Sequence, residues 1–261
     1  ESIPRKTVGG QDLFLDLLKE RAETGRIYIM NIDHCNSHSS FIDKVEMSNL
    51  CQEITLPTKP IQHIDDENGE IALCILSAIN IGKIRDASDF EVLCDLSVRS
   101  LDELIDFQQY PVRAAEIATK ARRSLGVGFI GLAHYLAKQG VKYEDPAAWQ
   151  IIHDLTESFQ YNLLRATVQL AKEKGACQYS DNTKYSHGIL PIDTYKKDVD
   201  ELVPNNLKHD WESLREEVKE YGVRNSTLSA QMPSESSSVV CNATNGIEPP
   251  RGYLSIKKSK K

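Results

Sequence analysis

The sequence has little of what marks a secreted or membrane protein. Only six cysteines are spread over 261 residues, which is too sparse for a disulfide scaffold and indicates a reduced, cytoplasmic protein. No apolar run approaches the roughly 20 residues of a membrane span. The basic residues near the N-terminus are not followed by the apolar core of a signal peptide. We therefore expect no membrane partner and no secretion.

Positive charge is also in short supply. The chain has 31 Lys and Arg residues against 38 Asp and Glu, for a formal net charge of −7. Nucleic-acid binding needs a basic footprint, so no nucleic-acid partner is expected. The basic residues of the last segment, 257–261, form either a solvated tail or the edge of something longer.

What the chain does contain is ordinary globular composition with alternating patterns. Hydrophobic residues make up 40% and charged residues 26%, which is typical of a globular domain. Periodicity predicts helices over about 11–25, 86–107, 112–138, 146–174 and 209–221, with glycines closing several of them. It predicts strands at 27–32, 53–56, 71–76 and 226–230. Strands that alternate with helices indicate one α/β domain over 1–261.

The segment Gly126-Val-Gly128-Phe-Ile-Gly131 matches the glycine pattern of dinucleotide-binding loops. That motif must follow a strand and open a helix. The residues before it, 118–124, have a helical pattern, so close packing through small residues is favoured over a cofactor site.

Possible metal ligands occur at Asp33, His34, Cys35 and His38. No C-x-x-C pair or second histidine pair completes a tetrahedral set, so a hydrogen-bonded turn after the predicted strand is favoured and no metal is expected. The acidic run 65–67 lacks the alternating ligands of a calcium loop and is interpreted as a solvated turn.

Three chemically useful side chains stand two residues apart at the start of the predicted strand 53–56. Asn49, Cys51 and Glu53 would face the same side in strand geometry and so present an amide, a thiol and a carboxylate to one pocket. The ordinary alternative is a buried cysteine and a solvated glutamate. Spacing alone leaves both open.

The remaining cysteines are expected by default to be core residues, namely Cys74, Cys94, Cys177 and Cys241. The run from Pro233 to Ser238 is a hydroxyl-rich turn that opens a short helix ending at Gly246. Small hydroxyls and free N–H groups at a helix start bind phosphate oxygens. A plain serine N-cap is the alternative, at about even odds on spacing alone.

At these residues the sequence resembles the large, catalytic (α) subunit of ribonucleotide reductases, most closely the aerobic class I type. The family signature is matched in order by Trp211, Leu214, Gly222, Val223, Asn225, Ser229, Ala230 and Pro233. Further family blocks are similar to the segments 48–53, 68–74, 233–237 and 242–253, which together cover nearly the whole chain.

The resemblance implies a ten-stranded α/β barrel with a finger loop through its centre. Cys51 would be the thiyl radical at the loop tip, and Glu53 the base for the ribose 3′-hydroxyl. Asn49 would hydrogen-bond the ribose, and Cys74 would be one of two reducing thiols. The substrate site for the ribonucleoside diphosphate would be formed by Pro233, Ser234, Glu235, Ser236 and Ser237.

The resemblance also implies partners. The radical would come from a separate, metal-containing small subunit, and the electrons from a donor of the thioredoxin or glutaredoxin type. No cofactor or metal would be bound by this chain itself. The thiol partner of Cys74, the nucleotide-sensing domain and the C-terminal tail of the family have no counterpart here. We therefore expect a partial barrel domain, truncated at both ends, that needs the remaining segments of the large subunit and is not active alone.

Two alternatives stay open at this point. One is a non-enzymatic fragment of an interrupted gene, which only folds with or binds the rest of the reductase. The other is a small thiol oxidoreductase, which is disfavoured because no cysteine pair has C-x-x-C spacing.

Overall fold

The computed structural model describes residues 3–254 and 256, and the chain divides into two units, Glu1–Asn31 and Ile32–Lys261. The first unit holds helix α1, Gly10–Thr24, which ends at Gly25 in the left-handed conformation. The helix and its glycine stop were predicted correctly. No residue of α1 is buried.

The predicted strand at 27–32 is wrong. Residues 26–31 have no strand partner, and Ile32 already begins helix α2, Ile32–His38. A strand exists only where a neighbour takes up its backbone N–H and C=O groups. An apolar, β-branched run without such a neighbour stays irregular.

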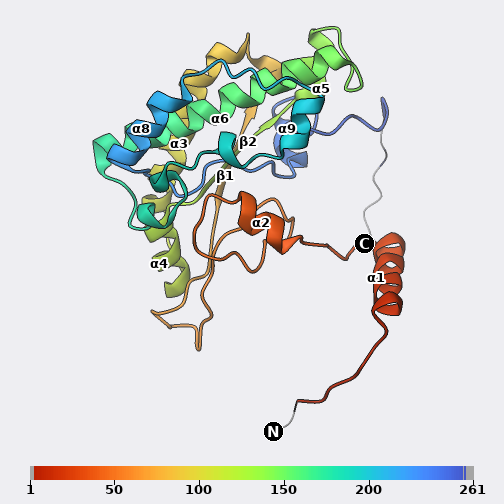
Figure 1. Ribbon diagram of the computed structural model, residues 1–261, viewed down its shortest axis with the longest axis vertical. Helices are drawn as coiled ribbons and strands as arrows, with labels where there is room; N and C mark the ends of the chain where they lie inside the picture. Colours follow the sequence, from red (N-terminus) through yellow and green to blue (C-terminus); the bar gives the residue numbers. More distant parts are fainter. Residues whose placement is uncertain (1–2, 255, 257–261) are drawn as a thin grey trace. The chain divides into compact units, whose positions relative to one another are not determined.

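A small parallel sheet lies at the centre of the second unit (Figure 1). Strand β1, Ile75–Asn80, pairs with β2, Leu125–Ile130, with Ile75 opposite Leu125. On the other side of β2, Val127 forms a parallel bridge with Ser229. Every residue of β2 is buried, as expected for a parallel strand covered on both faces.

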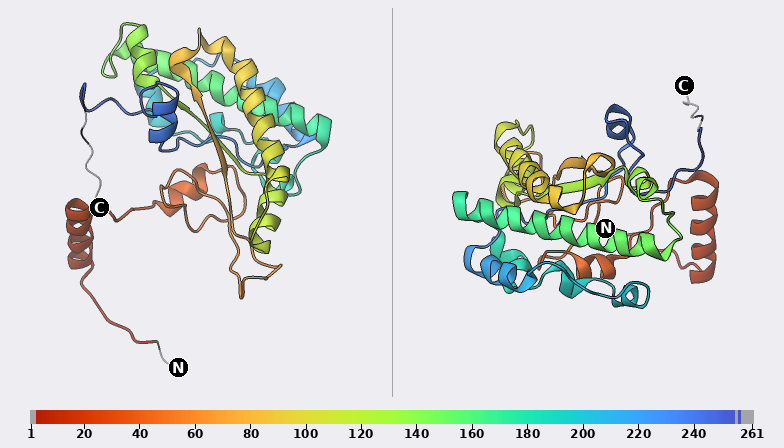
Figure 2. Two further views of the ribbon diagram at one scale, coloured as in Figure 1. Left: turned by 180° about the vertical axis from the view of Figure 1, so that it is seen from behind. Right: turned by 90° about the horizontal axis from the view of Figure 1, so that it is seen from above.

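Helices cover this sheet. The long helix α6, Pro146–Lys174, packs against α3, Phe90–Phe107, and against α8, Trp211–Tyr221 (Figure 2). In the core between α3, β2 and α6, the rings of Phe90 and Phe129 meet the Phe159 ring edge-on, with centroids 5.4 and 5.3 Å away. The helix stops at Gly175 and Gly222 occur where predicted.

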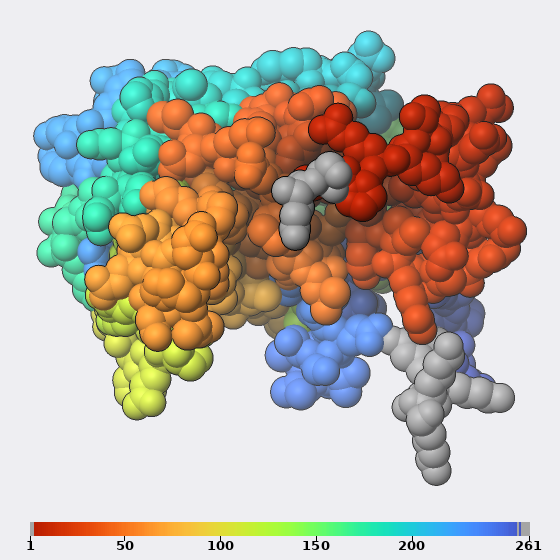
Figure 3. Space-filling model, turned by 90° about the horizontal axis from the view of Figure 1, so that it is seen from below, coloured from red at the N-terminus to blue at the C-terminus, as the bar shows by residue number. Residues whose placement is uncertain are grey.

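Shorter elements complete the second unit. They are α4, Arg113–Arg122; α5, Leu132–Lys138; α7, Pro191–Thr194; α9, Glu235–Val240; and the 3-10 turns η1, Ile81–Lys83, η2, Ala87–Asp89, η3, Ser180–Asn182, η4, Tyr185–His187, and η5, Lys197–Glu201. Between α2 and β1 runs a segment without helices or strands, coloured orange, which covers the face seen in Figure 3.

The single helix predicted over 112–138 is wrong, because α4, β2 and α5 occupy this range. Helix α4 ends at Arg123, which takes the left-handed conformation with φ 48°. A left-handed residue other than glycine costs about 1–2 kcal/mol. The Arg123 guanidinium offsets this cost by ion pairs of 2.6 Å to Asp102 and 2.8 Å to Asp106. These ion pairs join residues distant in sequence and so could not be predicted from the local pattern.

The glycine motif at 126–131 does not follow a strand, because the residues before it are helical up to Arg122, as predicted, and the motif itself forms β2. Gly126 and Gly128 lie inside β2, and Gly131 is the N-cap of α5. The expected close packing is present, because a Cβ on Gly128 would lie 2.3 Å from the backbone oxygen of Ala230. These glycines let the 229–232 segment approach β2.

Other predicted boundaries shift. No strand forms at 53–56, β1 begins at Ile75 rather than Ile71, and the predicted strand 226–230 is an extended segment with one bridge. The α/β class is confirmed, and the sheet of the described residues is open rather than a closed barrel. Within residues 3–254 and 256, no helix combines the length and the apolar character needed to cross a membrane.

Candidate active site

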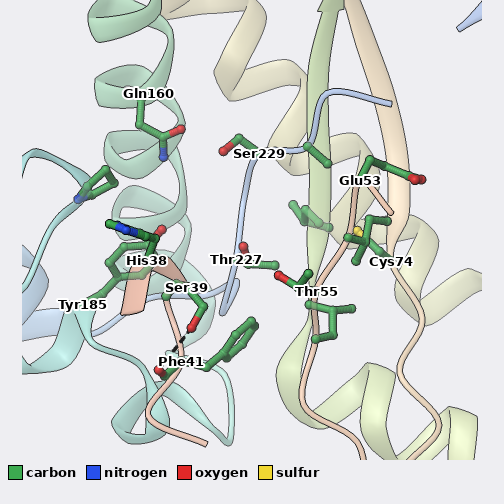
Figure 4. Close-up of a pocket in the computed structure, with 16 residues that line it drawn as sticks. His38, Ser39, Phe41, Glu53, Thr55, Cys74, Gln160, Tyr185, Thr227 and Ser229 are labelled. Atoms are coloured by element: carbon green, nitrogen blue, oxygen red, sulfur yellow. Dashed lines mark hydrogen bonds between the residues drawn. The ribbon is translucent and has the colours of Figure 1, made fainter. Parts of the chain in front are cut away.

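A cavity of about 250 Å³ lies beside the sheet (Figure 4). Its walls come from the end of α2 and the residues after it, the 53–56 segment, the residue before β1, α6, and the extended segment beside β2. The lining residues are His38, Ser39, Ser40, Phe41, Glu53, Ile54, Thr55, Leu56, Cys74, Leu125, Gln160, Tyr185, Pro191, Thr227, Ser229 and Ala230.

Glu53 and Cys74 lie together on one side of this cavity, opposite His38, Gln160 and Tyr185 (Figure 4). Among the described residues, the Glu53 Oε2 atom is buried and has no hydrogen-bond partner. Burial, together with the negative charge of Glu53, raises the pKa of the Cys74 thiol to about 12. Cys74 is therefore a protonated thiol at neutral pH, in the same cavity as the unpartnered Glu53 oxygen.

Cys51 is exposed and lies in a turn instead of the predicted strand. The Asn49 N–H donates to Ile54 O (3.3 Å), and the Ile54 N–H donates to the Asn49 Oδ1 atom (3.2 Å). Gln52 takes a positive φ of 61° and donates its N–H to Asn49 O. Alternation along a strand therefore does not bring the three side chains together, and Cys51 and Asn49 do not line the cavity.

The serine turn lies outside the cavity, although the same segment supplies Ser229 and Ala230 to it. Ser234 is buried, occupies the N-cap position of α9, and makes no capping hydrogen bond with its side chain. Its hydroxyl donates to Met232 O at 3.1 Å instead. Glu235, Ser236 and Ser237 are exposed in the first turn of α9, and Pro233 is exposed before the helix. A serine thus does stand at the N-cap position, as the alternative interpretation has it, but it does not cap the helix with its side chain.

Several cavity residues were not identified as site candidates from the sequence. Thr227 and Ser229 had a usable signal, because residues two apart in the predicted strand 226–230 share a side. Gln160, within the long helix α6, and Tyr185, in a 3-10 turn, had none. Burial raises the pKa of Tyr185 to about 12, so its hydroxyl remains protonated in this wall.

The other candidates from the sequence are the histidine segment and three further cysteines. The segment of His34 and His38 forms α2, not a turn after a strand, and the described residues hold no cluster of three or more metal-ligand side chains. Cys94 and Cys177 are buried core residues as predicted, whereas Cys241 is exposed. The prediction for Cys241 is wrong because it follows the last turn of a helix of only six residues.

Comparison with known proteins assigns the chain to a family. The model "Ribonucleotide reductase, barrel domain" matches residues 1–261, so the chain belongs to the ribonucleotide reductase family. Among its curated relatives, the ribonucleoside-diphosphate reductase subunit alpha of Haemophilus influenzae is 59% identical over 262 residues, which are 99% of this chain and 35% of that protein.

More distant relatives give the same result. The ribonucleoside-diphosphate reductase 1 subunit alpha of Escherichia coli is 56% identical over 263 residues, 100% of this chain and 35% of that protein. The subunit alpha of Enterobacteria phage T4 is 45% identical over 264 residues, with 99% and 34% covered. The chain thus spans about a third of the length of these relatives.

Proposed function

We propose that this chain carries catalytic residues of an α subunit that reduces ribonucleoside diphosphates to deoxyribonucleoside diphosphates through a thiyl radical. One observation carries the proposal: Glu53 has a buried, unpartnered carboxylate oxygen in the same cavity as the protonated thiol of Cys74. A buried acceptor without a partner is costly to a fold. An unpartnered carboxylate oxygen in the same cavity as a thiol is suited to proton transfer to and from a bound substrate.

The first half of the reaction uses Cys51 and Glu53. As a thiyl radical, Cys51 takes the hydrogen atom from the ribose 3′-carbon and becomes a thiol. Glu53 accepts the 3′-hydroxyl proton and returns it at the end of the cycle; the 2′-hydroxyl takes one proton from the reducing dithiol and departs as water. The radical reaches Cys51 from a separate, metal-containing small subunit.

The second half uses Cys74. Cys74 and a second thiol from another segment of the subunit give two electrons and two protons to the substrate and form a disulfide. Cys51 returns its hydrogen atom to the 3′-carbon and regains the radical. A donor of the thioredoxin or glutaredoxin type then reduces the disulfide by thiol exchange. The balance is one ribonucleotide and one dithiol giving one deoxyribonucleotide, one disulfide and one water.

Substrate binding is assigned to Asn49 and to the turn at the start of α9. Asn49 would contact the ribose hydroxyls, for which its side-chain N–H groups are the available donors because Oδ1 already accepts from Ile54. The diphosphate would lie at Pro233, Ser234, Glu235, Ser236 and Ser237. The exposed hydroxyls of Ser236 and Ser237 are suitable donors to phosphate oxygens.

We further propose that the open sheet is part of a ten-stranded α/β barrel. The described part of the chain supplies two parallel strands and one bridged segment. Unpaired strand edges favour association with further strands, so the remaining segments of the large subunit would complete the barrel.

The test uses a complete reductase that contains this chain together with its small subunit. Cys51→Ser should abolish hydrogen abstraction, because a hydroxyl does not serve as the radical carrier. Cys74→Ser should still allow the substrate radical to form but block its normal reduction, so that substrate breakdown products accumulate. Single-turnover measurement of radical decay and of deoxyribonucleotide separates the two variants.

Identical behaviour of Cys51→Ser and Cys74→Ser would remove the assigned roles. An inactive wild-type assembly that still binds the other segments would instead support the alternative, a non-enzymatic piece of the reductase.

A further inference from the structure

Arg122, the last residue of α4, connects two separate parts of the chain that carry candidate site residues. It is only 2% exposed. Its Nε donates to the Glu70 Oε2 atom at 2.8 Å, and its terminal Nη1 donates to the Asp43 Oδ2 atom at 2.9 Å. Glu70 lies just before Cys74, and Asp43 lies in the segment that leads into the Cys51 turn.

The Glu70 end of this connection is rigid. Its carboxylate, 3% exposed, also accepts from the Tyr179 hydroxyl at 3.0 Å and pairs with the Lys59 Nζ atom at 2.5 Å. Burial alone would raise the pKa of Glu70, but the hydrogen bonds from Lys59 and Arg122 outweigh it and hold the pKa below its ordinary value. The Arg122 guanidinium lies over the Tyr179 ring, 4.3 Å from its centroid. Glu70 is therefore charged and fully paired.

The Asp43 end is fixed as well. The Asn182 side-chain amide donates to the Asp43 Oδ1 atom at 3.3 Å, and Ile42 N–H donates to Asn182 O at 2.9 Å. The backbone oxygen of Arg122 accepts from Ser226 N–H at 3.1 Å, next to the cavity residues Thr227 and Ser229. Arg122 thus binds all three chain segments that supply the Glu53, Cys74 and Thr227 walls.

Its neighbour Arg123 provides a contrast within the same turn. Arg123 is equally buried, at 4% exposed, and pairs with Asp102 and Asp106 of α3. Its side-chain hydrogen bonds go to α3, and within the described part of the chain none reaches the 41–74 region. Arg123 therefore links the end of α4 to α3, whereas Arg122 links the segment before the Cys51 turn to the segment before Cys74.

We propose that Arg122, through Asp43 and Glu70, is a positioning residue that sets the separation between the Cys51–Glu53 turn and Cys74. This inference rests on the proposed function. With the separation fixed, the substrate radical made at Cys51 meets the reducing thiol without delay. With a looser separation, radicals still form but are lost before reduction. The quantity under control is the yield of deoxyribonucleotide per radical consumed.

The experiment compares two matched variants in the complete reductase. Asp43→Asn removes the charge of a half-exposed partner of Arg122, whereas Asp106→Asn does the same to an exposed partner of Arg123. We expect Asp43→Asn to lower the yield per radical at least threefold and Asp106→Asn to leave it unchanged. Arg122→Lys, which loses the planar two-carboxylate fork, should lower the yield further.

A purely structural role gives a different result. Product and radical consumption would then fall together in Asp43→Asn, and an unchanged ratio would overturn the inference. If Arg122→Lys does not fold, the Asp43→Asn and Asp106→Asn pair still decides. Failure of the proposed function gives another result: the wild-type assembly forms no product, and Cys51→Ser is no different from it. Failure of the positioning role alone leaves an active wild type and an unchanged yield per radical in Asp43→Asn.

Discussion

The two halves of the candidate site differ in exposure, and the difference follows their chemistry. The inner half, Glu53 and Cys74, lines a cavity, while the outer half, Cys51, Ser236 and Ser237, faces solvent. Burial keeps the Cys74 proton in place and leaves the Glu53 oxygen unpartnered. The outer groups have lone pairs and hydrogens available for partners that arrive from outside. Burial thus keeps the thiol of the inner half protonated, whereas exposure lets the outer half contact partners from solution.

The largest expected effect tests the enclosure of Cys74. Burial first, then the charge of Glu53, raises its pKa from the ordinary 9.0 to about 12. Since the thiolate is the reactive form, alkylation by iodoacetamide at pH 8 should be roughly a thousandfold slower in the folded chain than in urea. The folded state holds this proton more tightly, so stability should decline as the pH rises from about 9 towards 12. Peptide mass spectrometry measures the rates.

The exposed Cys51 and Cys241 are internal controls for reagent access and should be alkylated in the folded chain. Equal rates for Cys74 in folded and unfolded chain would erase the distinction between the two halves.

The second effect tests the outer half. Ser236→Ala with Ser237→Ala, in the assembled enzyme, should weaken diphosphate binding at least tenfold, because each hydrogen bond to a charged group contributes about 1.5–3 kcal/mol. The melting temperature should stay unchanged, since both hydroxyls are exposed. Unchanged affinity with a lower melting temperature would mean that these serines stabilise the fold and do not bind the diphosphate.

The third effect concerns the cavity wall formed where the 229–232 segment packs against β2. Gly128→Ala places a Cβ 2.3 Å from the backbone oxygen of Ala230, and such overpacking costs about 1–3 kcal/mol of unfolding free energy. Gly126→Ala is the matched control, because its nearest atoms are the side chains of Leu76 and Cys74, which are able to shift. Urea denaturation should rank Gly128→Ala as the more damaging. The reverse order would mean that the 229–232 segment is free to move.

The smallest effect separates burial from charge within the inner half. Glu53→Gln removes the second cause of the raised Cys74 pKa and leaves the first, burial. The alkylation rate of Cys74 at pH 8 should therefore rise less than tenfold. A larger increase would make the Glu53 charge, rather than enclosure, the main reason that this thiol keeps its proton.

The local sequence determined those helices that begin or end at a nearby proline or glycine. Helix α6 begins with Pro146 and ends at Gly175, and α8 ends at Gly222, as predicted. In both, apolar periodicity defines the helix, and glycine supplies a backbone conformation that other residues rarely adopt. The blocks around Cys51, Cys74 and Ser234 were likewise sufficient to indicate the family that the comparison confirmed.

Only the tertiary structure decided where the predicted helix 112–138 breaks and which candidate residues meet. Arg123 ends α4 in a conformation that asparagine or glycine usually takes, because Asp102 and Asp106 hold its side chain. Glu53 joins Cys74, and Cys51 stays outside, because a turn with Gln52 at positive φ replaces the expected strand. Ion pairs and turns of this kind depend on residues distant in sequence, so their energies are absent from any local pattern.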